Sequence, residues 1–313
     1  MNSKVRVIIF LLCVTGISVF LNGHVLGRYS KYFFQLQDTS PCACEKCLSE
    51  DDLNFFNKSV EPFLSANYIL SEDTFNWWKR LQNEARNFST YKTTVDRLFQ
   101  MFPPGPDVKE PSPDLCRTCA VVGNSRNLKG SHYGPLIDVN DIIMRINFGH
   151  TKGFEADVGT RTTHQIMYPE SAMDLDNNST HLVLIPFKIK DLEWLLKAFP
   201  TGKSYGPVKS KIKANKDLVM LINPAFMRYV HEVWLEKKGK YPSTGFMAFV
   251  LALHICDEVH VFGFGADKYR NWSHYWEKLK DSNLKTGPHP GTDEYRIIQK
   301  VAEQQKIKFY TGW

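Results

Sequence analysis

The chain has 313 residues, a length that fits one large domain as well as two smaller ones. Hydrophobic residues make up 43% of it and charged residues 23%, which supplies enough apolar surface for a sizeable core and excludes a fibrous or disordered protein. The formal net charge of +6 is spread along the chain without a long lysine or arginine run. This distribution argues against a nucleic-acid-binding groove and suits an anionic ligand.

The first residues predict a membrane anchor. Lys4 and Arg6 precede an apolar run of the length that spans a bilayer, and the two charges favour a cytoplasmic N-terminus. A cleaved signal peptide is the alternative, and in either case the rest of the chain enters the secretory lumen. The chain therefore divides into a cytoplasmic tail, a signal-anchor transmembrane helix, a short stem and a lumenal domain, at residues 1–6, 7–26, 27–40 and 41–313.

Asn-X-Ser/Thr sequons agree with a lumenal location, although such tripeptides are common by chance. They begin at Asn57, Asn87, Asn177, Asn178 and Asn271. We expect the first four to carry N-linked glycans.

The seven cysteines become informative in an oxidising compartment. One of them, Cys13, lies in the predicted anchor, and the remaining even number predicts three disulfides. Two Cys-x-x-Cys spacings leave a zinc site open as the alternative. The lumenal cysteines are Cys42, Cys44, Cys47, Cys116, Cys119 and Cys256.

Two kinds of pattern succeed one another along the lumenal part. Residues 50–102 are amphipathic with apolar residues at helical spacing, and a loop rich in proline separates them from the rest of the domain. From Cys116 onward, short β-rich runs alternate with helices, which predicts a mostly parallel sheet covered on both faces. The predicted strands are 120–122, 142–146, 165–168, 182–185, 218–222, 259–262 and 307–310. The predicted helices are 191–199, 225–238, 243–255 and 293–305.

A buried strand runs into a Gly-Asn-Ser turn at Gly123, Asn124 and Ser125, the place where open α/β sheets bind nucleotides. The turn matches neither Gly-x-Gly-x-x-Gly nor a P-loop, so an ordinary strand-to-helix turn is an equally good interpretation. Asn147 ends the next strand. Its amide should point at the same edge of the sheet, where it can bond a phosphate or sugar oxygen.

Two further patterns concern ions. Ser243 or Thr244 suits the N-cap of an apolar helix whose free N–H groups favour an anion, although capping alone explains these residues equally well. Asp174 and Asp176 match the Asp-x-Asp pattern of a divalent-cation site. They lie in a polar segment rather than after a buried strand, so we interpret them as part of a solvated loop.

His289 lies in a Gly-Pro-His-Pro-Gly segment, which is neither helix nor strand, just before a predicted helix. The positive end of the helix dipole favours a neutral imidazole, and a neutral imidazole is what a general base requires. A lone exposed histidine without a function is the alternative. His274, between Trp272 and Trp276, suits either packing or stacking on a sugar.

Together these patterns resemble the animal sialyltransferases, glycosyltransferase family 29, over nearly all of the lumenal part. The chain is similar in order to the large, small, third and very small (His-x4-Glu) motifs of that family, at residues 116–164, 241–266, 274–277 and 289–294. Within the family it looks most like the β-galactoside α-2,3-sialyltransferases that act on Galβ1,3GalNAc, judging by residues 77–82, 154–159 and 241–245.

The resemblance implies an α/β fold with a single Rossmann-like domain of the variant GT-A type. It implies inverting transfer of sialic acid from CMP-sialic acid to the 3-hydroxyl of terminal galactose in Galβ1,3GalNAc-type glycans of glycoproteins or glycolipids. It also implies no metal or other cofactor, and a single-pass type II protein of the Golgi membrane with a lumenal catalytic domain. The alternatives are a lumenal glycan-binding protein on an inactive transferase scaffold and, less well supported without a P-loop-like site, a sulfotransferase.

The resemblance also implies roles for individual residues. His289 would be the base, with His274 as the second catalytic residue, and Gln82 would contact the acceptor. Tyr205, Tyr241 and His274 would contact the leaving phosphate. The rest of the donor would be held by Asn124, Ser125, Asn147, Ser243, Thr244, Gly245 and Gly265. The implied disulfides are Cys119–Cys256, Cys44–Cys116 and Cys42–Cys47.

Two features depart from the family pattern. Pro290 follows His289 where relatives often carry an acidic residue, which would stiffen the loop. Asn271 makes a sequon beside the third motif, where a glycan would crowd the active site. We therefore expect Asn271 to be unoccupied.

Overall fold

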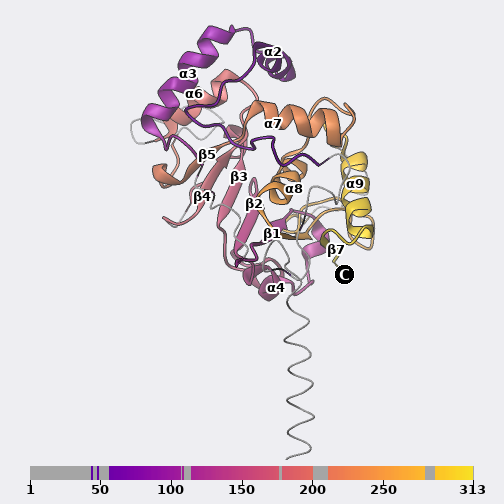
Figure 1. Cartoon of the computed structure of the whole chain (residues 1–313). Coiled ribbons are helices and arrows are strands. Elements are labelled where there is room, and N and C mark those ends of the chain that lie inside the picture. The colour runs from indigo at the N-terminus through magenta and orange to yellow at the C-terminus, as the bar shows by residue number, and fades with distance from the viewer. Residues whose placement is uncertain are drawn as a thin grey trace, which may run out of the picture.

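Parallel strands form the centre of the fold. The computed structural model describes residues 44, 48, 56–106, 108, 114–175, 178–199, 211–278 and 286–312. In this part of the chain a seven-stranded sheet has the order β5-β4-β3-β2-β1-β6-β7, and every neighbouring pair is parallel (Figure 1). The strands are β1 Thr118–Val122, β2 Ile142–Ile146, β3 His164–Met167, β4 His181–Leu184, β5 Val219–Leu221, β6 Glu258–Phe262 and β7 Lys308–Tyr310. Every predicted strand is present, with ends that differ by at most about two residues, and the predicted α/β fold is confirmed.

The strand order reverses at β1. From β1 the chain moves outward through β2, β3, β4 and β5, and later returns to add β6 and β7 on the other side. Val122 lies beside Arg145 of β2 and Phe262 of β6, so three strands end at one level. The carboxyl ends of the strands at such a switch point border a crevice in which open α/β sheets bind their ligands.

Helices cover both faces of the sheet. Helix α8 packs against β1, β2, β3 and β6, and ten of its twelve residues are buried. Side chains of β1 alternate between two cores, because Cys119 and Val121 belong to the core that contains α8, whereas Ala120 and Val122 belong to the core that contains α4 and α5. The α-helices are α2 Glu72–Leu81, α3 Phe88–Met101, α4 Gly134–Asp138, α5 Glu155–Val158, α6 Ile189–Ala198, α7 Pro224–Tyr229, α8 Thr244–Ile255 and α9 Gly291–Glu303.

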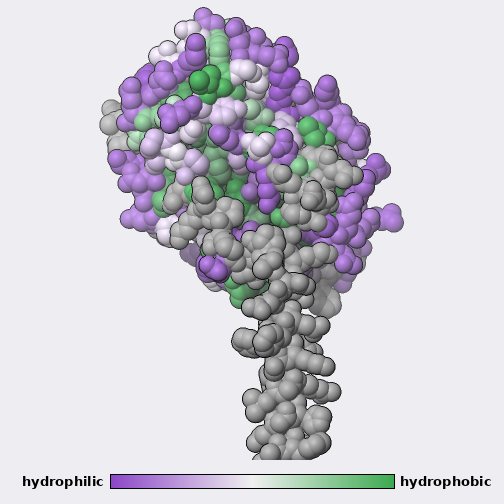
Figure 2. Space-filling model, in the orientation of Figure 1, coloured by the Kyte–Doolittle hydropathy of each residue, from purple (hydrophilic) through white to green (hydrophobic). Residues whose placement is uncertain are grey.

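Four of the helices gather on one side of the sheet. Figure 1 shows α2, α3, α6 and α7 gathered around the β4–β5 side of the sheet, with α4 at the opposite end and α9 beside β7. In the same orientation, Figure 2 shows a mainly hydrophilic surface with smaller hydrophobic patches between the hydrophilic residues.

The helical prediction for residues 50–102 is wrong at its beginning. Among the described residues of that range, the first helix starts at Glu72, after the N-cap Ser71. Ahead of it, Phe63 forms an antiparallel bridge with Ile222 next to the edge strand β5. The tertiary contact holds this segment extended and covers the edge of the sheet.

The helix predicted at 225–238 is also too long. Helix α7 ends at Tyr229 and continues only as a π-helical turn over Val230–Trp234. Glu236 and Lys237 then have φ angles of +50° and +64°, which a right-handed helix does not allow.

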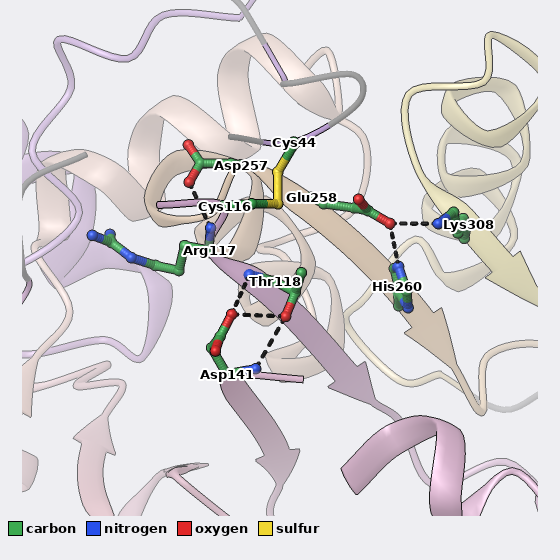
Figure 3. Close-up of a disulfide and its surroundings, with 9 residues drawn as sticks. All are labelled: Cys44, Cys116, Arg117, Thr118, Asp141, Asp257, Glu258, His260 and Lys308. Atoms are coloured by element: carbon green, nitrogen blue, oxygen red, sulfur yellow. Dashed lines mark hydrogen bonds and ion pairs between the residues drawn. A yellow bond between two sulfur atoms is a disulfide. The ribbon is translucent and has the colours of Figure 1, made fainter. Parts of the chain in front are cut away.

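Two of the implied disulfides are present. Cys119 of β1 is bonded to Cys256 at the end of α8, and Cys44 is bonded to Cys116 just before β1 (Figure 3). The zinc alternative is wrong, because these sulfur atoms are bonded to one another. Figure 3 shows the nearby carboxylate of Glu258 directed instead at His260 and Lys308, at 2.7 and 2.5 Å. Cys42 and Cys47 lie outside the described residues.

The predicted membrane anchor lies outside the described residues, as do the predicted cytoplasmic tail and the predicted stem. Within the part that the structure describes, no helix combines the length and the apolar character needed to cross a bilayer. The most apolar helix, α8, has 12 residues, whereas a span needs about 20.

Candidate active site

A cavity of about 440 Å³ opens at the carboxyl ends of the central strands. Its wall contains the residues that come after β1, β2, β3, β4 and β6, together with the start of α8. Of the predicted site residues, those that line it are Gln82, Asn124, Ser125, Asn147, Tyr241, Ser243, Thr244, Gly245, Gly265, His274 and His289. The remaining one, Tyr205, lies outside the described residues.

Asn147 is held in a demanding conformation at the end of β2. Its φ angle is +52°, in the left-handed region that asparagine tolerates better than most residues. The amide oxygen accepts a hydrogen bond from Ser171 Oγ at 2.8 Å, and the backbone carbonyl accepts one from Gln165 Nε2 at 2.6 Å. With its oxygen engaged, the amide of Asn147 has its two N–H donors left for an anionic or hydroxylated ligand.

The Gly-Asn-Ser turn after β1 packs tightly against the turn after β6. A Cβ atom at Gly123 would lie 2.3 Å from the carbonyl oxygen of Gly263, so only glycine fits there. Ser125 Oγ donates to the carbonyl of Gly265 at 2.5 Å and accepts from the N–H of Asn127. Asn124 Nδ2 donates to the carbonyl of Ile146 at 2.9 Å. These contacts lock β1, β2 and β6 together at the rim of the cavity.

The segment around His274 is attached to the turn after β1. Ser125 and His274 form an antiparallel bridge, and Tyr275 N donates to the carbonyl of Asn124 at 3.1 Å. The imidazole of His274 stacks on Trp276, with ring centroids 4.6 Å apart. Its Nδ1 lies 2.8 Å from Glu277 Oε1, which leaves Nε2 for a ligand. The aromatic setting therefore serves to orient the imidazole.

His289 has the environment of a general base. Its Nδ1 lies 3.1 Å from the carbonyl oxygen of Tyr241, an arrangement in which Nδ1 carries the proton and Nε2 carries a lone pair. Burial lowers the pKa of His289 below its ordinary value, so the neutral imidazole is favoured. The lowered pKa agrees with the predicted neutral state, because desolvation outweighs the opposing hydrogen bond to the Tyr241 backbone.

Glu294, five residues after His289, is buried beneath the site. It accepts hydrogen bonds from Ser243 N at 2.7 Å and from Ser243 Oγ at 2.6 Å. Ser243 is the N-cap of α8, and its Oγ accepts from Phe246 N at 3.1 Å, as the sequence predicted for Ser243 or Thr244. The glutamate therefore fixes the start of α8 with respect to α9.

One end of the cavity includes residues that the sequence did not single out. Gln82 Nε2 donates to the hydroxyl of Tyr241 at 2.7 Å. Beside this pair lie Tyr168 and Phe187, with the rings of Phe187 and Tyr241 5.0 Å apart. We call this end of the cavity, with Gln82, Tyr168, Glu170, Phe187, Lys188 and Tyr241, the Gln82 end. Most of these residues come directly after β3 and β4. They could have been predicted from the sequence, because ligands bind at the carboxyl ends of parallel strands.

The acidic pair interpreted as a loop does not line the cavity. Asp174 Oδ1 accepts a hydrogen bond from Lys213 N at 2.7 Å, and Asp176 lies outside the described residues. The contact gives Asp174 a structural role that is separate from the cavity.

The sequons differ in accessibility. The side chains of Asn57, Asn87 and Asn178 are exposed, whereas Asn177 lies outside the described residues. Asn271 is only 6% exposed, and its Nδ2 donates to both carboxylate oxygens of Asp267, at 3.0 and 2.8 Å. The nitrogen that would carry a glycan is therefore already engaged, in agreement with the expectation that Asn271 is unoccupied.

Comparisons with known proteins identify the family. Residues 63–306 match the model of glycosyltransferase family 29 (sialyltransferase). The chain is 42% identical to CMP-N-acetylneuraminate-beta-galactosamide-alpha-2,3-sialyltransferase 1 of Mus musculus, over 95% of this chain and 92% of the relative. Identity to the Sus scrofa protein of the same name is 44%, over 87% and 82%. The chain therefore belongs to the sialyltransferases of glycosyltransferase family 29.

A solved structure agrees with this assignment. The crystal structure of a mammalian sialyltransferase in complex with Gal-beta-1-3GalNAc-ortho-nitrophenol matches with a TM-score of 0.78 and 42% sequence identity. The match covers 87% of this chain and 100% of that chain. The fold that the sequence resemblance implied is thus confirmed over the full length of that chain.

Proposed function

We propose that this chain transfers sialic acid from CMP-sialic acid to the 3-hydroxyl of a terminal galactose, with inversion at the anomeric carbon. The observation that carries the proposal is His289, a partly buried imidazole whose Nδ1 is engaged by the carbonyl of Tyr241 in the same cavity as Asn124 and Gln82. The names of the relatives, which describe α-2,3-sialyltransferases of β-galactosides, support the same reaction.

The base acts on the acceptor. Nε2 of His289 takes the proton of the galactose 3-hydroxyl while that oxygen forms a bond to the anomeric carbon of sialic acid. The bond from the anomeric carbon to the phosphate oxygen breaks on the opposite face, and its electron pair leaves with CMP. The transition state resembles an oxocarbenium ion. A positioned general base contributes on the order of 10² to 10⁴ in rate to such a step.

The leaving phosphate needs hydrogen-bond donors. We assign this role to His274, to the Tyr241 hydroxyl and to the N–H groups of Asn147, with the free N–H groups at the start of α8 near Thr244 completing the site. Tyr205 keeps its proposed role in the same contact. Asn124, Ser125, Gly245 and Gly265 line the cavity where the rest of the donor would lie.

Turnover should require no metal ion, because CMP leaves with a single phosphate that protein donors can stabilise. Activity after exhaustive chelation tests this proposal. We expect full turnover with EDTA present. Loss of activity that manganese restores would contradict the proposal, and Asp174 would then be a candidate metal ligand.

The proposed acceptors are Galβ1,3GalNAc-type glycans of glycoproteins or glycolipids. The proposed setting is the Golgi membrane, with the segment at 7–26 as a single-pass type II anchor and the enzyme in the lumen. The intact set of Asn124, Asn147 and His289 argues against a glycan-binding protein on an inactive scaffold, because binding alone does not require a base.

The decisive assay uses the full chain in detergent with CMP-sialic acid and a panel of acceptors. The panel contains Galβ1,3GalNAc, Galβ1,4GlcNAc and GalNAc without galactose. We expect an α-2,3-linked product, formed fastest with Galβ1,3GalNAc and not formed with GalNAc alone. Acceptor binding without turnover would support the glycan-binding alternative instead.

A further inference from the structure

The fixed charges of the cavity are confined to the Gln82 end. Among the described residues that line it, Glu170 and Lys188 are the only aspartate, glutamate, lysine or arginine side chains. Lys188 Nζ lies 3.1 Å from Glu170 Oε1. The donor-binding turns therefore rely on neutral donors and histidine, whereas the opposite end carries a carboxylate and an ammonium group.

The positive charge of Lys188 is already matched by a second carboxylate. Lys188 Nζ lies 3.0 Å from Oδ1 of Asp191, whose side chain is 2% exposed. The other oxygen of Asp191 accepts from the N–H groups of Phe187 and Lys188, at 2.7 and 3.1 Å. Asp191 is therefore the built-in partner of Lys188 at the start of α6. With all three groups ionised the charges sum to −1, and of the two carboxylates only that of Glu170 is exposed.

Glu170 is placed to act on a ligand. Its side chain is 46% exposed at the cavity, and its Oε2 has no partner among the described residues. It belongs to the 3₁₀ turn Pro169–Ser171, whose last residue bonds to Asn147. Burial raises the pKa of Tyr168, the negative charge of Glu170 adds to that shift, and the positive charge of Lys188 opposes it.

We propose that Glu170 makes the Gln82 end selective for neutral galactosides and against acceptors that carry a sulfate or carboxylate group on the sugar next to galactose. An anionic group placed there would approach Glu170, which shares the single ammonium group of Lys188 with Asp191, and like charges at short range repel in a partly desolvated cavity. This is discrimination through an unfavourable contact with the wrong ligand. The inference rests on the proposed function, because it concerns the acceptor of that reaction.

The test compares two acceptors on Glu170→Gln. One is a neutral Galβ1,3GalNAc glycoside, and the other is the same glycoside with a 6-sulfate on GalNAc. The measured quantity is the ratio of kcat/KM for the sulfated acceptor to kcat/KM for the neutral one. At low salt we expect the substitution to raise this ratio about three- to tenfold. An unchanged or lower ratio would overturn the proposal.

Asp217→Asn is the matched control. Asp217 is 72% exposed, lies 3.7 Å from the ammonium group of Lys216 and does not line the cavity. Asp217→Asn removes one negative charge from the protein, just as Glu170→Gln does. We expect Asp217→Asn to leave the ratio within about twofold of the wild-type value, because exposed charges are strongly screened. An equal rise in both variants would mean that net charge, and not Glu170, sets the ratio, and would also overturn the proposal.

Salt provides an independent readout. Screening of a local repulsion should raise the wild-type ratio as salt increases, and should have little effect on the ratio of Glu170→Gln. If instead the formal net charge of +6 attracted the sulfated acceptor at long range, added salt would weaken that attraction and lower the ratio. A wild-type ratio that falls with salt contradicts the inference. If the wild type failed to sialylate the neutral glycoside at all, the proposed function itself would fail, which is a different result.

Discussion

Glu294 and Ser243 are joined by two hydrogen bonds, one from the backbone N–H and one from the hydroxyl of the serine. The pair links the start of α9, just after His289, to the start of α8, which faces the proposed donor site. One buried carboxylate therefore connects the proposed base with the proposed phosphate-binding helix.

Two substitutions of Glu294 distinguish its hydrogen bonds to Ser243 from its negative charge. Glu294→Ala leaves the Ser243 N–H without its partner, so we expect a loss of about 1 to 3 kcal/mol in the free energy of unfolding and a higher donor KM. Glu294→Gln keeps an oxygen for the N–H and offers an amide donor to Ser243 Oγ, so it should restore most of the donor KM. Steady-state kinetics and urea unfolding measure both effects. A donor KM in Glu294→Ala equal to that of the wild type would contradict the positioning role.

His289→Ala should lower kcat on the order of 10² to 10⁴ while CMP binds almost as before, because the base acts on the acceptor. Kinetics together with CMP titration by calorimetry separate the two quantities. His274→Ala provides the comparison, since it should weaken CMP binding. More than about a tenth of the wild-type kcat in His289→Ala would refute the assignment.

The pH dependence of the reaction should reflect the same imidazole. A base works in its neutral form, which prevails above the folded-state pKa, and burial sets that pKa below the ordinary 6.5. We therefore expect kcat/KM to stay level down to about pH 6.5 and to fall below it as His289 becomes protonated. A fall that begins well above pH 7 would show that another group controls the rate.

The Cys119–Cys256 disulfide should contribute strongly to stability. The bond closes a sequence separation of 137 residues, for which the chain-entropy relation gives about 4 to 5 kcal/mol. Replacing both cysteines with alanine should lower the free energy of unfolding by an amount of that order, as measured in urea. Peptide mapping without reduction gives the direct check, and a free thiol at either position would contradict the structure.

Gln82→Ala should affect the acceptor more than the donor. Loss of a hydrogen bond to a neutral sugar costs about 0.5 to 1.5 kcal/mol, which corresponds to an acceptor KM about two- to tenfold higher. The donor KM should change less, because Gln82 reaches the donor side only through its hydrogen bond to the Tyr241 hydroxyl. Gln304→Ala, at the exposed end of α9 and away from the cavity, is the matched control. A change confined to the donor KM would show that the Gln82 end does not bind the acceptor.

Strands and capped helices could be predicted from the sequence because local patterns determine them. Runs such as 142–146 consist largely of branched apolar residues, and parallel strands buried on both faces need continuous runs of this kind. Ser243 before an apolar helix is an equally local signal. The segment before Glu72 was predicted wrongly, because its contact with Ile222 overrides its helical periodicity.

The candidate site was predictable where residues belong to recognisable motifs, as Asn124, Asn147 and His289 do. The tertiary structure alone brought Glu170 and Lys188 to the Gln82 end, because they come after strands β3 and β4 and meet only when the parallel sheet assembles. It also supplied the burial that keeps His289 neutral, since desolvation depends on what packs around a group. Local sequence largely determines the secondary structure of a segment, whereas the charge and burial at a site are set by residues far apart in the chain.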